Sequence, residues 1–299
     1  MITLVHVSDM HISPLPQMHA SEFTLKRALA YLSWQRKRKH RFSPDILQRL
    51  MADIRAQEAD HVLVTGDQCN LSLKAEFVQA APWLSALGLP ENVSVIPGNH
   101  DAHGRRREAT WEAHWGAYMR GDDGVSGFPY LRRRDGVAII GVSSAVPTAL
   151  MMANGRVGAE QLARLREVLL RSKAEGLLRV VLIHHPPQAG AAPWRKALSD
   201  APALRAVLQE TGAELVLHGH GHAAVRAQLQ GPQGPIAVRG CAAASSNGYR
   251  MPAAHYHRIR IEGRPEEWAL EITHRHYDAA GDGFVTTDEE SLRIPRLTV

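Results

Sequence analysis

Five short polar clusters, each directly after an apolar run, constrain the fold of this 299-residue chain more than any other feature. In chain order they are Asp9-Met10-His11, Gly66-Asp67, Gly98-Asn99-His100-Asp101, His184-His185-Pro186-Pro187 and Gly219-His220-Gly221-His222. The apolar runs are typical of buried strands. Because an α/β fold gathers the ends of its strands at one edge of a sheet, we expect these distant clusters to meet there.

Helical patterns separate several of these runs. Ser43-Pro44-Asp45 is a helix start, and apolar residues recur at helical spacing from Ile46 to Ile54. Further helices are predicted over 74–87 and 197–209. Strands are predicted at 2–7, 61–65, 93–96, 137–142, 180–183, 214–217, 236–239, 255–261 and 268–274. The early alternation predicts βαβ units, and the later strands predict a second, more mixed sheet.

The chain is expected to form one domain over 1–299, because no linker, internal repeat or low-complexity tract divides it. Two departures stand out. A basic amphipathic helical insertion is predicted around 21–42, and a C-terminal tail around 277–299. Apolar residues of the tail, Ile294 and Leu297, could dock on the same chain or on a second copy, so the oligomeric state is left open.

Composition limits the class of protein. A chain that is 44% hydrophobic and 22% charged has ample material for a core and is not a disordered one. Cys69 and Cys241 are expected to be reduced thiols of a cytosolic protein, and no secretory leader or membrane span is predicted. We therefore expect a cytoplasmic location or a peripheral one at the inner membrane surface. The net charge of +5 indicates an anionic partner.

The clusters carry the side chains of a metal site. Asp9 and His11 are two residues apart in an extended segment and project to the same side, while the two oxygens of Asp67 could bridge two ions. The remaining donors are the amide of Asn99 and the imidazoles of His184, His220 and His222. Such a mixed N/O set suits Mn, Fe, Co, Ni or Zn.

Two such ions favour the hydrolysis of phosphoesters. They can clamp a phosphoryl group, lower the pKa of a shared water and stabilise the entering and leaving oxygens of an in-line displacement. The leaving alkoxide needs a proton or a positive charge, and His100 is the candidate, with Asp101 to orient it.

The five clusters resemble the motifs of the calcineurin-like metallophosphoesterases, in that family's order from Asp9 to His222. The resemblance implies an α/β fold in which two mixed β-sheets pack as a sandwich flanked by helices, with four layers, αββα. It also implies a first metal bound by Asp9, His11, Asp67 and His222, and a second bound by Asp67, Asn99, His184 and His220. His100 would act on the phosphate or the leaving group. From spacing alone, His218 could replace a neighbouring ligand, and His185 could replace His184.

The substrate is less constrained. Substrate contacts are expected from Asn99, His103 and Arg105, and the basic runs at 36–39, 105–107 and 132–134 could bind phosphate groups. In the insertion, Leu25, Leu29, Leu32 and Trp34 supply apolar surface beside a dense positive flank. It could rest on an anionic membrane, cap a lipid-bearing substrate or pack on the protein body.

The leading hypothesis is a phosphodiesterase for a small molecule, of the cyclic nucleotide or glycerophosphodiester type. The alternatives are a pyrophosphatase of a nucleotide-linked lipid such as UDP-diacylglucosamine, a nuclease, and a non-catalytic metal-binding interaction module. His255, His257, His274 and His276 alternate along two predicted strands. They are expected to be structural or solvent-facing, since no second constellation surrounds them.

Overall fold

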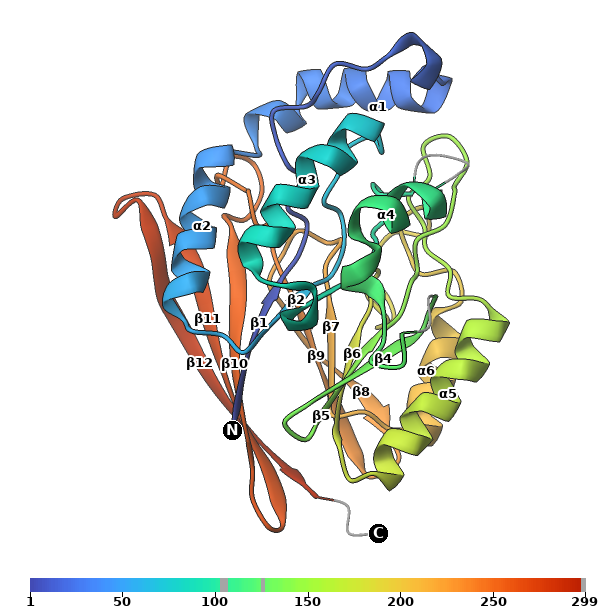
Figure 1. The fold of residues 1–299 in the computed structure, drawn as a ribbon, viewed down its shortest axis with the longest axis vertical. Helices are drawn as coiled ribbons and strands as arrows, with labels where there is room; N and C mark the ends of the chain where they lie inside the picture. The colour runs from blue at the N-terminus through green and yellow to red at the C-terminus, as the bar shows by residue number, and fades with distance from the viewer. Residues whose placement is uncertain (103–106, 125–126, 297–299) are drawn as a thin grey trace.

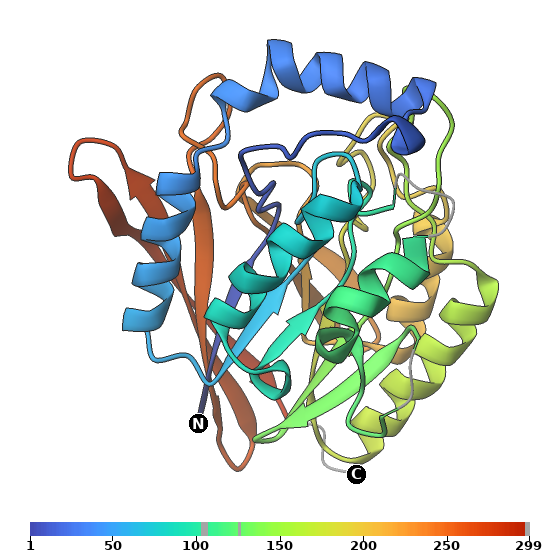
Figure 2. The same cartoon turned by 45° about the horizontal axis from the view of Figure 1, so that its top comes forward.

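Two six-stranded sheets pack face to face between two layers of helices in the computed structural model (Figures 1 and 2). The structure describes residues 1–102, 107–124 and 127–296, and for residues 107–110 the backbone alone. This arrangement confirms the predicted four-layer αββα sandwich, in which each sheet buries one face against the other and one against helices.

The first sheet contains the strand that leads into the Asp9 cluster. Its order is β12 (Gly283–Pro295), β11 (Glu267–Asp278), β10 (His255–Gly263), β1 (Ile2–Val7), β2 (His61–Val64) and β3 (Val93–Val95). β1, β2 and β3 are parallel, so the first three polar clusters emerge at the same edge. β10, β11 and β12 extend the sheet in antiparallel fashion.

The second sheet carries the two histidine clusters. Its order is β4 (Tyr130–Arg134), β5 (Val137–Gly141), β6 (Leu178–Leu182), β7 (Leu215–His218), β9 (Gly234–Gly240) and β8 (Val225–Gly231). β5, β6, β7 and β9 are parallel, whereas β4 and β8 pair antiparallel at the two edges.

Helices cover the outer faces of both sheets. On the first lie α2 (Pro44–Ala56) and α3 (Lys74–Leu87), with α4 (Arg107–Trp115) beside α3; on the second lie α5 (Ala159–Ala174) and α6 (Ala201–Thr211) (Figure 1). Short 3-10 turns occur at Pro90–Asn92 (η3) and Gly116–Met119 (η4). The predicted start of α2 is confirmed, because the Ser43 side chain accepts a hydrogen bond from the backbone N–H of Ile46.

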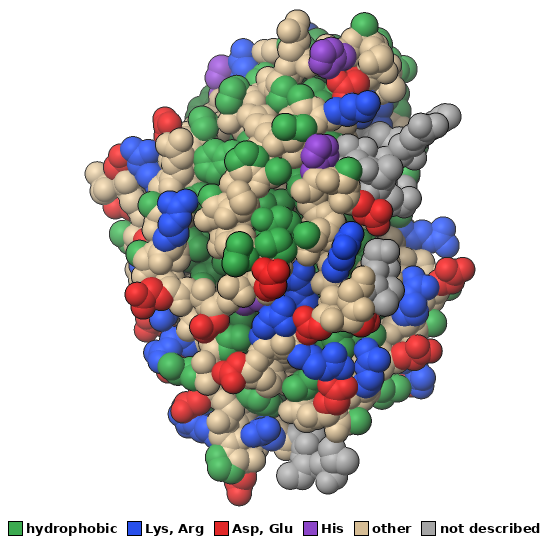
Figure 3. Space-filling view, viewed as in Figure 1, with side chains coloured by type: hydrophobic (Ala, Val, Ile, Leu, Met, Phe, Trp, Pro, Cys, Tyr) green, Lys and Arg blue, Asp and Glu red, His purple; other side chains and the backbone are tan. Residues whose placement is uncertain are grey.

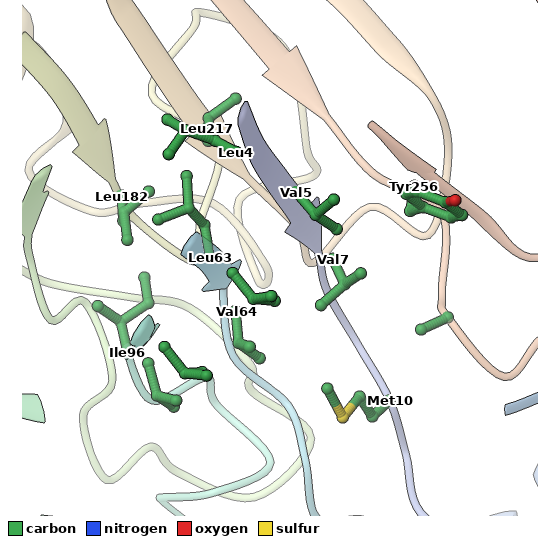
Figure 4. Packing of buried hydrophobic residues seen from close by; sticks show 14 of the residues in the cluster. Leu4, Val5, Val7, Met10, Leu63, Val64, Ile96, Leu182, Leu217 and Tyr256 are labelled. Atoms are coloured by element: carbon green, nitrogen blue, oxygen red, sulfur yellow. The ribbon is translucent and has the colours of Figure 1, made fainter. Parts of the chain in front are cut away.

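The core follows the alternation of side chains along each strand. Leu4 of β1 belongs to one buried cluster with Leu182 of β6 and Leu217 of β7, which joins the two sheets (Figure 4). Val5 and Val7 point to the other face of the first sheet (Figure 4), the face that helices cover in Figure 1.

The insertion lies across the edge where the parallel strands end. It comprises η1 (Ala20–Glu22), α1 (Leu25–Arg36) and η2 (Arg38–His40), and α1 spans the top of the molecule in both ribbon views (Figures 1 and 2). Leu25, Leu29 and Leu32 are exposed as expected, but Trp34 is buried. Among the described residues, no helix combines the length and apolar character needed to cross a bilayer.

The C-terminal region differs from the expectation. Much of the segment predicted as a tail forms β12, which pairs with β11 along its length and places Ile294 opposite Trp268. β12 is mostly exposed and alternates exposed and half-buried residues only from Glu289 onward, over a largely polar sequence that hydrophobic periodicity does not detect.

For the histidines of β10 and β11, the structure excludes the solvent-facing alternative at three positions and leaves the structural one, although the reason given for the expectation was wrong. The strand register sets His6, His257 and His274 side by side on three neighbouring strands, and all three are buried with His255 and Cys241 between the sheets. A second constellation therefore does surround them, and His255, His257 and His274 do not face solvent. His276 is half-buried.

Candidate metal centre

The five polar clusters converge at one edge of the sandwich. The first loop continues the pairing of β1 with β2, because the N–H groups of Asp9 and His11 donate to the carbonyls of Gly66 and Asp67 at 2.9 and 3.0 Å. Most of the predicted ligands adopt the left-handed backbone conformation that non-glycine residues rarely use. These are Asp9, His11, Asp67, His220 and His222. Such conformations gather at functional sites, where the surrounding structure holds them.

The first predicted ligand set is compact. Nε2 of His222 lies 3.1 Å from Oδ1 of Asp9 and 3.2 Å from Nε2 of His11. Nε2 of His11 lies 3.9 Å from Oδ1 of Asp9 and 3.9 Å from Oδ2 of Asp67. Donor atoms of all four residues fall within 4.8 Å of one another, as ligands of one ion must.

The second predicted set shares an atom with the first. Oδ2 of Asp67 lies 3.3 Å from Nε2 of His184, which lies 3.2 Å from Oδ1 of Asn99. Nδ1 of His220 lies 2.8 Å from the same amide oxygen. Asp67 thus stands between two groups of donors and is placed to bridge two ions.

The chemistry of the donors fits metal ions. Oδ1 of Asp9, a donor atom of the first set, is buried and has no hydrogen-bond partner within the described residues, a costly state unless something else satisfies it. Nδ1 of His11 donates to the carbonyl of Cys69 at 3.1 Å, and Nδ1 of His184 to that of Thr65 at 2.7 Å. Each Nε2 lone pair is therefore left for a metal, in the usual arrangement of a ligating histidine.

Hydrogen bonds decide between the neighbouring histidines. His185 uses both ring nitrogens, Nδ1 with the Ser144 hydroxyl at 2.8 Å and Nε2 with the Ala153 carbonyl at 3.1 Å. His218 is likewise engaged, with the carbonyl of Gly219 and the side chain of Gln188. The geometry therefore favours His184 and His220 as the ligands.

Electrostatics favour the neutral form, which binds metals, at His11 and His220 but not at His184. Burial opposes protonation of His184, but the charge of Asp67 outweighs it and raises the pKa of His184 to about 9, so a metal ion must displace a proton there. Burial, followed by the charge of Arg38, lowers the pKa of His11 well below its usual value, and burial with the nearby His185 does the same for His220. Burial opposes ionisation of Asp9, but His222 and the other histidines outweigh it and lower the pKa of this carboxyl.

His100 lies beside Asp67, and its Nδ1 donates to the carbonyl of Asn70 at 2.7 Å. Asp101 has a different environment: its carboxylate accepts from the backbone N–H groups of Asp67, Gly98 and Cys69, each at 2.9 Å. Asp101 thus braces the loops that carry the ligands, while its role in orienting His100 stays a prediction.

Two predicted substrate contacts, His103 and Arg105, lie outside the described residues. Of the basic runs, 132–134 is used structurally, because Arg132 donates to backbone carbonyls, including that of Val93 at 2.7 Å, and Arg133 and Arg134 pair with Glu175 and Asp122. The run at 36–39 instead sends Arg38 into the site, between the rings of His11 and His100. The sequence predicted phosphate binding by the run at 36–39, but it did not identify Arg38 as the residue that enters the site.

A basic pocket of about 640 Å³ adjoins the same turn. Its lining comprises Arg36, Lys37, His40, Arg41, Asn247, Tyr249 and Arg250. Phe42 follows Arg41 of this lining and packs its ring on His11, with 4.5 Å between the ring centroids. The pocket is therefore a neighbour of the metal centre.

The sandwich and its two ligand sets define a class: α/β proteins with a binuclear metal centre at the strand ends. Consistent with this, the model of the calcineurin-like phosphoesterase family matches residues 2–224, so the chain belongs to that family. The reaction class is accordingly metal-dependent hydrolysis of phosphoesters, with two metal ions. A search of curated proteins found no match.

The solved structures that are similar to this chain are distant in sequence. A dimetal phosphatase from Danio rerio has a TM-score of 0.63 and 13% identity, with 99% of each chain covered. A 5'-nucleotidase precursor from Thermus thermophilus has a TM-score of 0.47 and 14% identity, covering 99% of this chain and 54% of that one. An NAD nucleotidase from Haemophilus influenzae has a TM-score of 0.49 and 11% identity, covering 98% and 50%. At such identities the first of these supports the fold alone.

Proposed function

We propose that this protein is a phosphodiesterase that hydrolyses a small phosphodiester of the cyclic nucleotide or glycerophosphodiester type. The observation that carries the proposal is the position of Asp67 Oδ2, 3.9 Å from Nε2 of His11 and 3.3 Å from Nε2 of His184. One carboxylate oxygen thereby serves two donor sets, which suits a pair of ions, with Mn, Fe or Zn as the expected identities.

Two bound ions would polarise the phosphoryl group and lower the pKa of a water at the site. The chain supplies the other parts. Since the Asn70 carbonyl engages Nδ1 of His100, Nε2 is the atom that can hold a proton for the leaving oxygen. Asn99 places its amide oxygen between His184 and His220, where it orients the second donor set.

The basic pocket supports a diester. A phosphodiester carries a second substituent on phosphorus, and the open pocket beside η2 offers space, cations and the aromatic ring of Tyr249 for it. A phosphorylated small molecule is therefore the proposed substrate. On the face in Figure 3, acidic and basic side chains are interspersed below the insertion, a pattern that gives little support to nucleic acid as the partner.

The test is hydrolysis of bis(p-nitrophenyl) phosphate by the Mn-loaded protein, beside p-nitrophenyl phosphate, cyclic AMP, glycerophosphodiesters and single-stranded DNA. We expect diester turnover, and we expect His100→Ala to lower kcat about a hundredfold or more with little change in metal content. A wild-type protein that holds two metals but cleaves none of these esters would favour the interaction module instead.

A nucleotide-linked lipid is a second candidate substrate, favoured by apolar side chains on the insertion. Phe23 and Leu25 are 63% and 66% exposed, and Leu29 and Leu32 are 41% and 46% exposed. An apolar stripe with a basic end can rest on an anionic membrane. Cleavage of UDP-diacylglucosamine, and sedimentation with anionic vesicles that the Leu29→Gln, Leu32→Gln double variant loses, would support it.

We further propose a cytoplasmic location, because Cys69 and Cys241 are both free and buried. The sedimentation experiment with anionic vesicles also tests the proposed peripheral contact with the membrane.

A further inference from the structure

The insertion is fastened to the loop that positions His100. Arg27 of α1 donates to the carbonyls of Leu71 and Ser72 at 3.1 and 2.6 Å. The adjacent Asn70 carbonyl accepts from Nδ1 of His100, and the Ser72 hydroxyl donates to the His100 carbonyl at 2.6 Å. At its other end, Phe42 bridges to Ser246 of the loop before β10. The position of η2 above the site is therefore fixed from both sides.

Arg38 of η2 extends into this site. Nη2 lies 3.1 Å from both ring nitrogens of His11, and Nη1 lies 3.2 and 3.1 Å from Nδ1 and Nε2 of His100. A nitrogen equally far from both nitrogens of one ring lies over the ring rather than on one lone pair. One guanidinium nitrogen thus lies over each of the two rings, which are nearly perpendicular at 86°, and the Phe42 ring has its centroid 5.3 Å from Cζ on a third side.

The charge of Arg38 has no direct counterpart. Across the described ranges, no carboxylate forms an ion pair with it, although Asp67, Glu76 and Asp9 act on it from further away. An arginine side chain is always charged at neutral pH, and that of Arg38 is only partly exposed. A part-buried guanidinium without an anion is costly, and such groups are usually paired.

The metal ligands do not remove this imbalance. The two donor sets contain two carboxylates, Asp9 and Asp67, and the buried Asp101 and Glu76 lie behind them, so that two divalent ions would match these four acids and leave Arg38 without a balancing charge. Arg38 adds a further positive charge beside the first set. A centre with this surplus needs an anion from outside the chain, and the planar fork of arginine matches two oxygens of a phosphate.

We propose that Arg38, contributed by the insertion, binds the non-bridging oxygens of the substrate phosphate, between the first metal position and His100. This inference rests on the proposed function and assigns the insertion a part in recognising phosphate. Arg38 also fixes which side of the phosphorus faces His100. The reacting group would then be anchored independently of its organic substituents.

The experiment compares Arg38→Gln with Lys39→Gln, which removes the neighbouring cation of the same turn. Lys39 is exposed and its ammonium donates to Gln35 at 3.1 Å. Inorganic phosphate is the probe, with binding to the Mn-loaded protein measured by calorimetry and competitive inhibition of bis(p-nitrophenyl) phosphate hydrolysis measured as Ki. Arg38→Gln is expected to weaken both, and to raise KM, by about tenfold to a hundredfold. Lys39→Gln should match the wild type, and both variants should retain the metal content and melting temperature.

An unchanged phosphate affinity in Arg38→Gln overturns the proposal, and so does a loss of metal with unchanged affinity per occupied site, since that would make Arg38 structural. If Arg38→Gln does not fold, Arg38→Lys decides: it keeps the charge but not the fork, so a several-fold weaker affinity supports the proposal and an equal one overturns it. Calorimetry distinguishes failure of this proposal from failure of the proposed function, because phosphate binding can be measured even if no diester is cleaved.

Discussion

Gly219 approaches Asp9 so closely that a Cβ atom at position 219 would overlap the Oδ2 atom of Asp9 and the hydroxyl of Ser8. The same Oδ2 accepts from the Ser8 hydroxyl at 2.7 Å and from the N–H of His220 at 3.0 Å. These contacts aim Oδ1 at the first metal position. Glycine is therefore required at position 219, because the side chain of Asp9, which follows β1, occupies the space that a Cβ atom would need.

Gly219→Ala is expected to shift the Asp9 carboxylate and weaken Mn binding about tenfold to a hundredfold, as the loss of groups that orient ligands usually does. Titration calorimetry of the metal-free protein measures the effect. Gly221→Ala is the matched control, because its Cβ atom would meet nothing closer than the Gly219 carbonyl at 4.0 Å. Equal affinity in the two variants would contradict the explanation.

Much of the site could be predicted because the chemistry is local to each cluster. Asp9-Met10-His11 and Gly219-His220-Gly221-His222 place donors at strand ends, and parallel strands bring those ends together. The choice of His184 over His185 depends on Ser144 and Ala153, which are far away in sequence, so no local pattern could make it. The role of Arg38 could not be predicted for a similar reason. Only the tertiary path of the insertion shows that Arg38, and not one of the neighbouring basic residues, enters the site.

Several elements were predicted from their periodicity, although α5, with Leu162, Leu165 and Leu169 buried at helical spacing, was missed. β1 and α2 were located because their apolar residues follow strand and helix periods. β8 and β12 are edge strands with mostly polar or exposed residues, so hydrophobicity alone does not reveal them. The burial of His255 and His257 could not be read from their own strands, because the segment after β9 of the other sheet covers them: Cys241 contacts His257, and the N–H of Ala242 donates to His255.

Substitutions of the neighbouring histidines test the assignment of ligands. His184→Ala is expected to lose the second metal, because Nε2 of His184 lies 3.3 Å from the bridging oxygen of Asp67. His218→Gln should keep both metals, since neither ring nitrogen of His218 faces a donor set. Elemental analysis of dialysed protein gives the metal content. Retention of two metals by His184→Ala and loss of one by His218→Gln would reverse the assignment.

Asp101 is expected to matter for stability as well as activity. Asp101→Ala leaves the buried N–H groups of Asp67, Gly98 and Cys69 without their acceptor, which should cost about 3 kcal/mol or more in the free energy of unfolding. Urea denaturation of the metal-free protein measures this cost. Asp60→Ala is a suitable comparison with a smaller expected loss, because its carboxylate accepts from the N–H of Thr3 at 2.7 Å in a part-buried position. A stable Asp101→Ala protein with only a changed pH profile would instead favour the orienting role.

Stability is expected to fall in mild acid. Burial, then Arg132, lowers the pKa of His61 to about 3, and burial, then His276, lowers that of His255 to about 2. Both values lie below the usual pKa of the unfolded chain, about 6.5, so only the unfolded state takes up protons between these limits. Each histidine therefore leaves stability unaffected above about pH 7 and lowers it by roughly 2 kcal/mol at pH 5.

Urea unfolding of the metal-free protein at pH 5 and pH 7.5 measures this difference. His61→Gln should reduce the pH dependence, because the amide can still reach the Ser94 hydroxyl that lies 2.8 Å from Nε2 of His61. A pH dependence identical to that of the wild type would show that His61 is not held neutral.

The buried histidines between the sheets are expected to bind no metal, although donor atoms of His6, Cys241 and His257 lie within 4.8 Å of one another. The Nδ1 atoms of His6 and His257 are 3.1 Å apart, and the centroids of the two rings are 5.4 Å apart. For this distance between the nitrogens, that is about the largest possible distance between the centroids. The two nitrogens therefore point at each other along one line, as in an N–H···N hydrogen bond, whereas the lone pairs of metal ligands converge on a point between them. Burial also raises the pKa of the Cys241 thiol well above its usual value, which disfavours the thiolate. We expect two metals per chain and no change in metal content in Cys241→Ser; a third equivalent that this variant loses would make the cluster a further metal site.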